Sequence, residues 1–486
     1  MSNETKEKIT VKKEENFSEW YTQVVQKAEL ADIRKGVQGF IVHMPWGFRI
    51  LRKIYEYLEK EVEDDNHEPY LFPVVVKKEN LEKEKEHAGF APDVFWITRA
   101  GDKQLEEEFA LKPTGETLIY PNYSLWIRSY NDLPFKGYQS RIMSYRNEKT
   151  TRPFLRGREF MFFETHDVFA THEEAINQVN KDLEMSQAVL KEKCKIPFVF
   201  FKRPQWDKFK GADATFTPDT IMPDGKRNQL GSTHDLGQNF AKAFDVMFQD
   251  KKGKKEYAWQ TCWGPGIWRM MAAIIGIHGD DKGLILPFDM APIQIIIVPI
   301  FSEKEKSSVM KYCEELKKSL GKYRTKIDTT EGSPGFKYNE WEMKGVPIRI
   351  EVGPKEVQAK KVTIALRTSK TKVESKVSDV SQSIEKHARE VDKEIERKAE
   401  EYFKDNTYNA KTLEELKNIM NKKRGFIKVP FCSVEMKGEK CAEKLKEETE
   451  GVYVCGTLYP KEEKASGNCI ICKKPANHIV YTAKSY

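Results

Sequence analysis

Arginines cluster in front of an aromatic segment in RNEKTTRPFLRGREFMFFETHDVF, residues 146–169. Arg146 and Glu148 are two residues apart, so a strand would place both on one face. A proline and a glycine further on are typical of a connecting loop, and Arg156 lies between them. Because guanidinium groups bind phosphate oxygens bidentately, an antiparallel strand pair joined by this loop can hold a polyphosphate.

The aromatic segment predicts a strand over residues 158–168. Side chains alternate between the faces of a strand, and one face would hold Arg158, Phe160, Phe162, Glu164, His166 and Val168. A half-buried strand whose polar residues reach solvent is one interpretation. The neighbouring arginines favour a binding site instead, with an aromatic floor, a carboxylate and an imidazole in one row.

The elements that position these residues belong to a chain of 486 residues, for which two or three domains are expected. Mixed helix and strand signals, including an aromatic strand at YLFPVVV (70–76), predict a first unit over residues 17–289, after a flexible N-terminus, residues 1–16. In residues 290–376, apolar strands alternate with a charged amphipathic segment, which is typical of an α/β module.

A connecting helix is predicted over residues 377–404, where apolar residues recur at intervals of three, four or seven. The last segment, residues 405–486, contains five of the eight cysteines. Four of them can surround one tetrahedral Zn²⁺: Cys432, Cys441, Cys469 and Cys472. The final C-x-x-C is the clearest part of this pattern, and Cys455 or His478 are alternative ligands.

Composition excludes several classes of protein. The net charge of +7 rests on 82 basic and 75 acidic residues, which fits a local patch for a polyanion and equally a well-solvated surface. No run of 18 apolar residues and no secretory signal is found, so we expect no membrane association. Eight cysteines in so long a chain do not form a disulfide scaffold, and a reducing, cytoplasmic location is expected.

The pattern R-x-E, loop, R-x-x-x-F, formed by Arg146, Glu148, Arg156 and Phe160, resembles motif 2 of class II aminoacyl-tRNA synthetases. Further segments resemble the prolyl-tRNA synthetase family in that family's order, from residue 17 to Tyr486: PTGETLIYP (113–121), NQLGSTHDLGQNF (228–240), QTCWGPGIWR (260–269), HGDDKGLILP (278–287) and SPGFKYNEWEMKGVPIRIEVGPKEV (333–357). The resemblance implies an α+β multi-domain protein. Its parts are an antiparallel-sheet class II catalytic core, an α/β anticodon-binding domain and a small zinc-binding α/β C-terminal domain.

The resemblance implies a proline–tRNA ligase, which forms prolyl-adenylate from L-proline and ATP with Mg²⁺ and transfers the prolyl group to tRNA(Pro). Arg146 would bind the α-phosphate and the amino-acid carboxylate, and Arg269 would clamp the γ-phosphate, as the two catalytic residues. Arg156 would reach the terminal phosphates. The remaining ATP contacts would be Glu148 at the adenine end, Phe160 under the adenine, and Gln229 and Ser232 near Mg²⁺ and the nucleotide.

The proline site would adjoin Arg146. Thr114 and Glu116 would accept hydrogen bonds from the secondary ammonium. The pocket wall and its hydrogen-bonded frame would consist of Phe162, Glu164, His166 and His234.

The sequence departs from the family at two places in this site. Phe162 stands where many relatives have tryptophan. Motif 3 is one residue longer than usual and has no threonine before Arg269, so no ligand contact is assigned to Gly266 or Ile267. Cys262 is expected to be a buried thiol near the pocket.

The interval from Phe169 to Gln229 leaves no room for the large editing domain of bacterial-type relatives, so the chain resembles the archaeal and eukaryotic-type branch. Lacking this domain, it is expected to activate some alanine or cysteine. For the tRNA, the resemblance indicates four anticodon-reading candidates: Lys337, Glu342, Arg349 and Glu351. A surface ion-pair network is the alternative role for these four residues.

Motif 1, over residues 36–73, is expected to form a long amphipathic helix followed by a strand with Pro73, and in class II enzymes this element forms the homodimer interface. Two alternative functions remain at this stage. A sister enzyme for threonine or glycine is disfavoured by the T-x-E loop and by GSTHDLGQ. A catalytically silent RNA-binding paralog is disfavoured by the intact set of three arginines.

Overall fold

The computed structural model describes residues 8–88 and 93–486. Its main feature is a twelve-stranded sheet with the path β21-β22-β24-β23-β9-β10-β12-β15-β8-β7-β3, and β11 pairs with β10 off this path. The strands are β3 (Glu68–Pro69), β7 (Phe135–Tyr145), β8 (Glu159–Phe169), β9 (Val199–Lys202), β10 (Ala214–Ile221), β11 (Arg227–Gln229), β12 (Gly231–Gly237), β15 (Trp259–Pro265), β21 (Thr407–Asn409), β22 (Phe426–Phe431), β23 (Tyr453–Leu458) and β24 (His478–Ala483). From β22 to β7, all neighbours on the path are antiparallel. The antiparallel core predicted for the first unit is confirmed.

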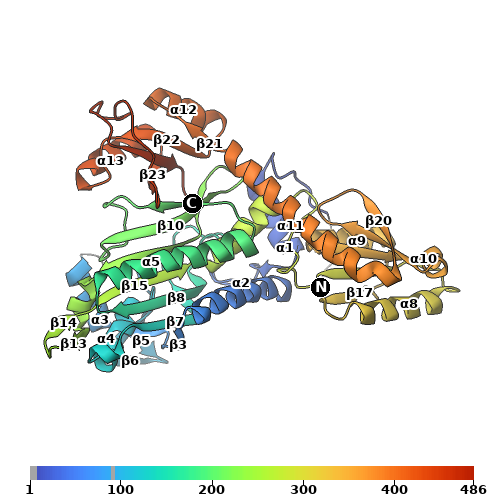
Figure 1. The fold of residues 1–486 in the computed structure, drawn as a ribbon, viewed down its shortest axis with the longest axis horizontal. Helices are drawn as coiled ribbons and strands as arrows, with labels where there is room; N and C mark the ends of the chain where they lie inside the picture. Colours follow the sequence, from blue (N-terminus) through green and yellow to red (C-terminus); the bar gives the residue numbers. More distant parts are fainter. Residues whose placement is uncertain (1–7, 89–92) are drawn as a thin grey trace.

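Helices cover one face of this sheet (Figure 1). The main ones are α1 (Phe17–Lys27), α2 (Pro45–Asp64), α5 (His172–Gln187) and α7 (Ile267–Ala273), and the π-helical turns Ala188–Lys193 and Ile274–His278 extend the last two. Smaller elements of this unit are β1 (Ala31–Asp32), β2 (Val42–His43), β4 (Val75–Lys77), α3 (Lys78–Ala88), β5 (Trp96–Ala100), β6 (Lys103–Leu111), α4 (Glu116–Trp126), α6 (Asn239–Phe244), β13 (Met247–Gln249) and β14 (Lys255–Tyr257). Phe163 of β8 and Trp263 of β15 pack with Leu51 and Met271 into one buried core. The odd-numbered residues of β8 therefore face the helices, and the even-numbered ones face the opposite side.

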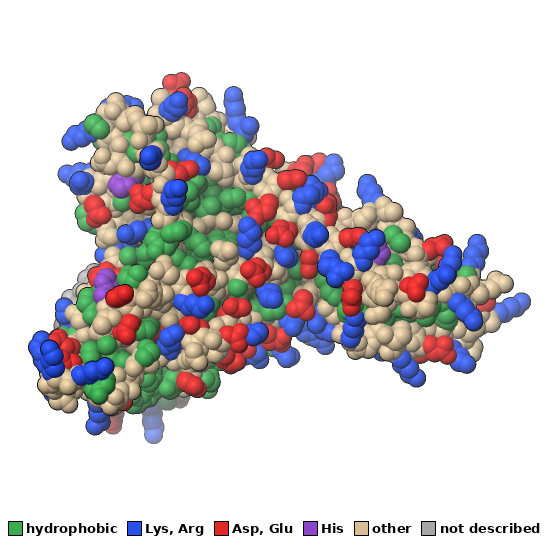
Figure 2. Space-filling model, viewed as in Figure 1, with side chains coloured by type: hydrophobic (Ala, Val, Ile, Leu, Met, Phe, Trp, Pro, Cys, Tyr) green, Lys and Arg blue, Asp and Glu red, His purple; other side chains and the backbone are tan. Residues whose placement is uncertain are grey.

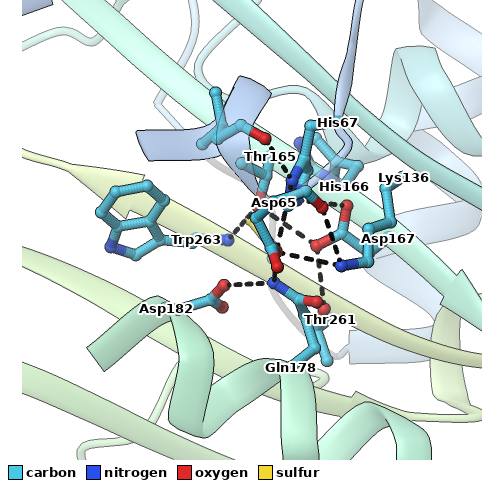
Figure 3. A network of polar contacts seen from close by, with 12 residues as sticks. Asp65, His67, Lys136, Thr165, His166, Asp167, Gln178, Asp182, Thr261 and Trp263 are labelled. Carbon is cyan, nitrogen blue, oxygen red and sulfur yellow. Dashed lines mark hydrogen bonds and ion pairs between the residues drawn. The ribbon is translucent and has the colours of Figure 1, made fainter. Parts of the chain in front are cut away.

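A buried polar network fixes this helix layer to the sheet (Figure 3). Asp167 of β8 lies 3.1 Å from Nε2 of His67. Gln178 of α5 donates to Asp65 and to Asp182, both at 3.0 Å. Since buried polar groups are costly unless paired, these contacts specify one position of α5 on the sheet.

A second sheet of five strands, in the order β17-β16-β18-β19-β20, forms the next unit. Its elements are β16 (Ile295–Pro299), α8 (Lys306–Ser319), β17 (Thr325–Ile327), α9 (Pro334–Met343), β18 (Ile348–Val352), α10 (Pro354–Ala359), β19 (Lys361–Leu366) and β20 (Lys372–Lys376). β16 pairs in parallel with β17 and β18, and the other pairs are antiparallel. The α/β architecture expected for this unit is confirmed.

The long helix α11 (Val380–Asp405) runs from this unit toward the C-terminal part (Figure 1). Its buried stripe includes Ile384, Val391 and Ile395, as the periodicity predicted. The C-terminal part adds α12 (Leu413–Lys422) and α13 (Glu439–Glu448). Its sheet is continuous with that of the first unit, because Thr457 and Leu458 of β23 pair with Lys202 and Phe201 of β9.

Three local expectations need correction. The strand predicted over residues 70–76 is limited to β4, which begins at Val75. The preceding residues form an extended loop, in which the rings of Tyr70 and Phe72 pack against Trp126. The motif 1 helix begins at Pro45 and is not followed by a strand at Pro73. Residues 8–16, which were expected to be flexible, lie against the core, where Lys13 Nζ donates to the carbonyls of Ile277 and Gly279 at 3.2 and 2.7 Å. Residues 1–7 of that expected N-terminus lie outside the described residues.

Basic and acidic side chains are interspersed on the face shown in Figure 2, over all three parts of the molecule. Across residues 8–88 and 93–486, none of the helices has both the length and the apolar character to cross a bilayer.

Candidate active site

A cavity of about 390 Å³ brings together residues from distant parts of the chain. Its wall includes the three arginines predicted to bind ATP, Arg146, Arg156 and Arg269. It also includes Thr114, Glu116, Glu148, Phe160, Phe162, Gln229, Ser232 and His234. Of the ATP and proline residues expected from the sequence, all except Glu164 and His166 therefore line one cavity.

Arg269 lies in the first turn of α7, which begins at Ile267 shortly after β15 ends, and it lines the cavity. Burial, together with the positive charges of Arg156, Arg227 and Arg146, lowers the pKa of Arg269 to about 10. A guanidinium stays protonated at neutral pH even so. Several guanidinium groups held this close favour the binding of an anion such as a triphosphate, although Glu148 and Asp219 already pair with two of them.

Arg156 lies on the loop between β7 and β8, as expected. Its Nη1 donates to Glu148 at 2.9 Å, and its Nη2 donates to the backbone carbonyl of Tyr486 at 2.8 Å. The hydroxyl of Tyr486 donates to Asp224 at 2.6 Å. Tyr486 thus braces Arg156, and Glu148 holds this arginine as well as facing the cavity.

Two further arginines line the cavity and were not predicted. Arg203 donates to the carbonyl of Cys455 and to Oε1 of Gln229, both at 2.8 Å. Arg203 and Arg227 lie 3.3 and 3.4 Å from the same carboxylate oxygen of Asp219. Arg227 shares a face of β11 with Gln229, a period-two signal that was available in the sequence. No spacing could reveal Arg203, because its partner Cys455 is 252 residues away.

The proline end of the cavity has acceptors beside an apolar wall. Thr114 donates to Glu116 at 2.6 Å, and burial raises the pKa of Glu116. His234 bonds to Thr215 at 2.9 Å, and burial lowers its pKa to about 3, so the ring is neutral. Thr114 and Glu116 thus present oxygen acceptors to the cavity, and His234 and Phe162 line the wall beside them.

Glu164 and His166 lie behind this wall instead of in it. Glu164 accepts hydrogen bonds from the backbone N–H of Gly115 at 3.1 Å and from Gln139 at 2.9 Å. Nε2 of His166 is 3.2 Å from Glu164. Burial disfavours the charged form of both groups, but their mutual attraction outweighs this effect. The pKa of Glu164 is therefore lowered by His166, and the pKa of His166 is raised by Glu164. A Cβ at position 115 would be 2.4 Å from Glu164, so this support requires glycine there. The two residues support the loop that presents Thr114 and Glu116.

The four anticodon candidates lie in the second unit. Arg349 pairs with Glu342 at 3.2 Å and with Glu351 at 3.1 Å, and its guanidinium stacks 3.9 Å above the ring of Tyr338. These three candidates pair with one another, and their role in reading the anticodon stays a prediction. Lys337 is 6% exposed and donates to the carbonyl of Asp328 at 3.4 Å, so it points into the protein.

The cysteine cluster of the C-terminal part has the composition predicted. Cys432, Cys441, Cys469 and Cys472 place their sulfur atoms within 4.8 Å of one another. Neither alternative ligand joins them, because Cys455 lies near Arg203 and Arg227, and His478 pairs with Glu462 at 3.1 Å. Four thiols at this separation fit a closed tetrahedral metal site.

An antiparallel sheet whose cavity holds one arginine before a loop and another in the first turn of a helix is the arrangement expected of a class II aminoacyl-tRNA synthetase. The model of the class II tRNA synthetase core domain (G, H, P, S and T) matches residues 95–278. An anticodon binding domain model matches residues 294–387, and a prolyl-tRNA synthetase C-terminal model matches residues 413–486.

Whole-chain comparisons specify the family. The chain is 51% identical over 483 residues to a proline–tRNA ligase of Thermofilum pendens, covering 98% of this chain and 99% of the relative. It is 41% identical over 449 residues to that of Methanocaldococcus jannaschii, covering 91% and 97%. A Giardia lamblia prolyl-tRNA synthetase solved with prolyl-adenylate matches with a TM-score of 0.93 at 31% identity, covering 98% of this chain and all of that one. The chain belongs to the proline–tRNA ligase family and is an aminoacyl-tRNA ligase.

Proposed function

We propose that the chain activates L-proline with ATP and transfers the prolyl group to tRNA(Pro). A carboxylate oxygen of proline attacks the α-phosphorus, and the bond to pyrophosphate breaks. A hydroxyl at the 3′ end of the tRNA then attacks the prolyl carbonyl, and AMP leaves. The observation that supports this function is the single cavity that joins three arginines to the Thr114–Glu116 acceptors.

The residue roles follow from charge and position in the cavity. Arg146 lines the same cavity and would bind the α-phosphate and the proline carboxylate. Arg156 and Arg269 hold the terminal phosphates, and Phe160 supports the adenine. The proteins of this class need little proton transfer, so catalysis comes from positioning and from charges fixed in advance.

Two metals belong to this proposal. Mg²⁺ would arrive on the triphosphate and neutralise part of its charge. Gln229 and Ser232 line that side of the cavity, and Oε1 of Gln229 already accepts from Arg203. The four clustered cysteines would hold a structural Zn²⁺, for which four thiolates are a typical ligand set.

A homodimer is proposed through an apolar patch beside motif 1, formed by Leu71, Val74, Leu125 and Trp126. Leu71 is 83% exposed and Leu125 is 62% exposed. Tyr70 and Phe72, which flank Leu71, pack against Trp126, so these exposed residues lie near one another. Exposed apolar surface of this kind favours a partner, and a second copy is the partner expected for class II enzymes. Sedimentation velocity should show a dimer that Leu71→Asp dissociates, whereas Met436→Asp, in the C-terminal part, should leave it intact. A monomeric unmutated chain would exclude the interface.

The compartment proposed is the cytoplasm. All eight cysteines, which lie within the described residues, are free. Free thiols and a cysteine metal site are typical of a reducing compartment.

Amino-acid-dependent ATP–pyrophosphate exchange tests the activity. Proline should support far faster exchange than threonine or glycine, and absence of exchange with every amino acid would indicate a silent RNA-binding paralog instead. Cysteine and alanine should support slow exchange, because an apolar pocket discriminates by only about 1–3 kcal/mol per methylene. Discrimination against both above roughly 10⁵ would refute the expected misactivation.

A further inference from the structure

The loop between β7 and β8 contains a tight turn that presents Arg156. Backbone hydrogen bonds run both ways between Arg152 and Arg156, at 2.7 and 2.9 Å. Phe154, in the middle of this turn, has φ of 60° and is fully buried. A left-handed conformation is uncommon and strained for a bulky residue, so contacts elsewhere must hold the turn in place.

Trp268 supplies the contacts on one side of this turn. Its ring packs edge-on against Phe154, with centroids 5.7 Å apart, and His43 lies 5.5 Å from it. The indole N–H donates to Nε2 of His43 at 3.1 Å. Burial lowers the pKa of His43 to about 4, so Nε2 stays a neutral acceptor at neutral pH. At Gly157 a Cβ would lie 2.5 Å from the Trp268 ring, which shows how closely the ring covers the loop.

The position of Trp268 in the chain links the two arginines at the terminal phosphates. It directly precedes Arg269 in the first turn of α7 and is 4% exposed. A displacement of its ring would move the loop with Arg156 relative to the helix with Arg269. Misplacement of a binding group by about 1 Å can cost on the order of 100-fold in rate.

We propose that Trp268 is a positioning residue that, through Phe154, Gly157 and His43, sets the distance between Arg156 and Arg269 at the ATP phosphates. This role rests on the proposed function of those two arginines. It concerns only the nucleotide side, because the Thr114–Glu116 loop is supported separately by Glu164.

The test compares Trp268→Phe and Trp268→Ala with Trp263→Phe as a matched control. Trp263 is also buried, but its indole N–H donates to Ser186 of α5 at 3.0 Å, whereas that of Trp268 donates to His43. Trp268→Ala should raise the KM for ATP by roughly 10- to 100-fold in proline-dependent exchange, with the KM for proline changed less than about threefold. Trp268→Phe, which keeps a ring over Gly157, should show a smaller rise. Trp263→Phe should leave both KM values unchanged.

Amide hydrogen exchange without ligands supplies a readout that does not depend on activity. In Trp268→Ala, residues 152–157 should exchange faster, while β8 keeps its protection. The positioning role would be overturned if Trp268→Ala changed the KM for ATP and the KM for proline equally, or if amide hydrogen exchange in residues 152–157 did not change. If the unmutated chain showed no proline-dependent pyrophosphate exchange, the proposed function would be refuted instead. Faster amide hydrogen exchange of the loop in Trp268→Ala would still support the contact between Trp268 and the turn.

Discussion

Glu116 is the carboxylate that a secondary ammonium would meet in the cavity. A substitution of this residue therefore tests the amino-acid end of the site alone. A hydrogen bond to a charged group contributes about 1.5–3 kcal/mol. Glu116→Gln should therefore raise the KM for proline by roughly 10- to 100-fold and leave the KM for ATP nearly unchanged. Glu148→Gln, at the other end, should affect ATP instead, because Glu148 holds Arg156. Steady-state exchange kinetics would measure both, and a change in the ATP KM of Glu116→Gln would contradict the assignment.

At the same scale, the alternation along β8 predicted which residues share a face but not how deep each lies. Phe160 and Phe162 reach the cavity, whereas Glu164 and His166 on the same face are covered by the Thr114–Glu116 loop. That cover comes from a segment about fifty residues earlier, with Gly115 and Glu164 separated by 49 positions. Local periodicity contains no information about such a cover. The same reason hid Arg203, whose partners come from β11 and β23.

At the scale of elements, the position of α5 on the sheet depends on Asp182. Its carboxylate accepts from Thr233 at 2.6 Å and from Gln178 at 3.0 Å, and Asp167 and His67 also face it. Burial and the charge of Asp167 raise its pKa to about 7. The folded chain thus keeps a proton that the unfolded carboxyl releases near pH 4, and the free energy of unfolding falls as pH rises from about 4 to 7.

Asp182→Asn removes this titration. Urea unfolding midpoints at pH 5 and pH 8 should differ more for the unmutated chain than for Asp182→Asn, with the unmutated chain less stable at pH 8. Burial lowers the pKa of His67, but Asp167 outweighs this effect, and the pKa is raised. His67 therefore also makes the folded chain less stable as pH rises, and Asp182→Asn retains this contribution. Parallel pH profiles for the two proteins would contradict the protonated state of Asp182.

The helices and strands themselves were largely predictable, since α8, α11, β16, β18 and β19 coincide with segments of clear apolar period. The segment 70–76 was the main exception. Its aromatic and β-branched residues suggested a strand. The residues before β4 instead form an extended loop, and the rings of Tyr70 and Phe72 pack against Trp126. Tertiary packing overrode a weak local preference there.

At the scale of the whole molecule, the C-terminal part is continuous with the catalytic sheet through β23 and β9. Loss of the proposed zinc should therefore reach the active site. Cys441→Ser is expected to lose the bound zinc, lower the unfolding temperature and reduce prolyl-adenylate formation, because the carbonyl of Cys455 on β23 holds Arg203. Metal analysis would measure the zinc content, thermal unfolding the stability, and proline-dependent pyrophosphate exchange the formation of prolyl-adenylate.

Cys313→Ser is the matched control for that experiment. Cys313 is buried in the second unit, away from the cluster, so its variant should keep its zinc and its activity. Zinc content unchanged in Cys441→Ser would contradict the assigned ligand set. Continuity of the two sheets was not visible in the sequence, because register between strands 255 residues apart depends on the folded neighbours of both.

A crystal structure of the chain with proline and a non-hydrolysable ATP analogue would test the central claim most directly. Arg146, Arg156 and Arg269 should each lie within hydrogen-bonding distance of phosphate oxygens of one analogue, with the proline nitrogen beside Thr114 and Glu116. Phosphates bound elsewhere, or fewer than three of these arginines in contact with them, would contradict the account.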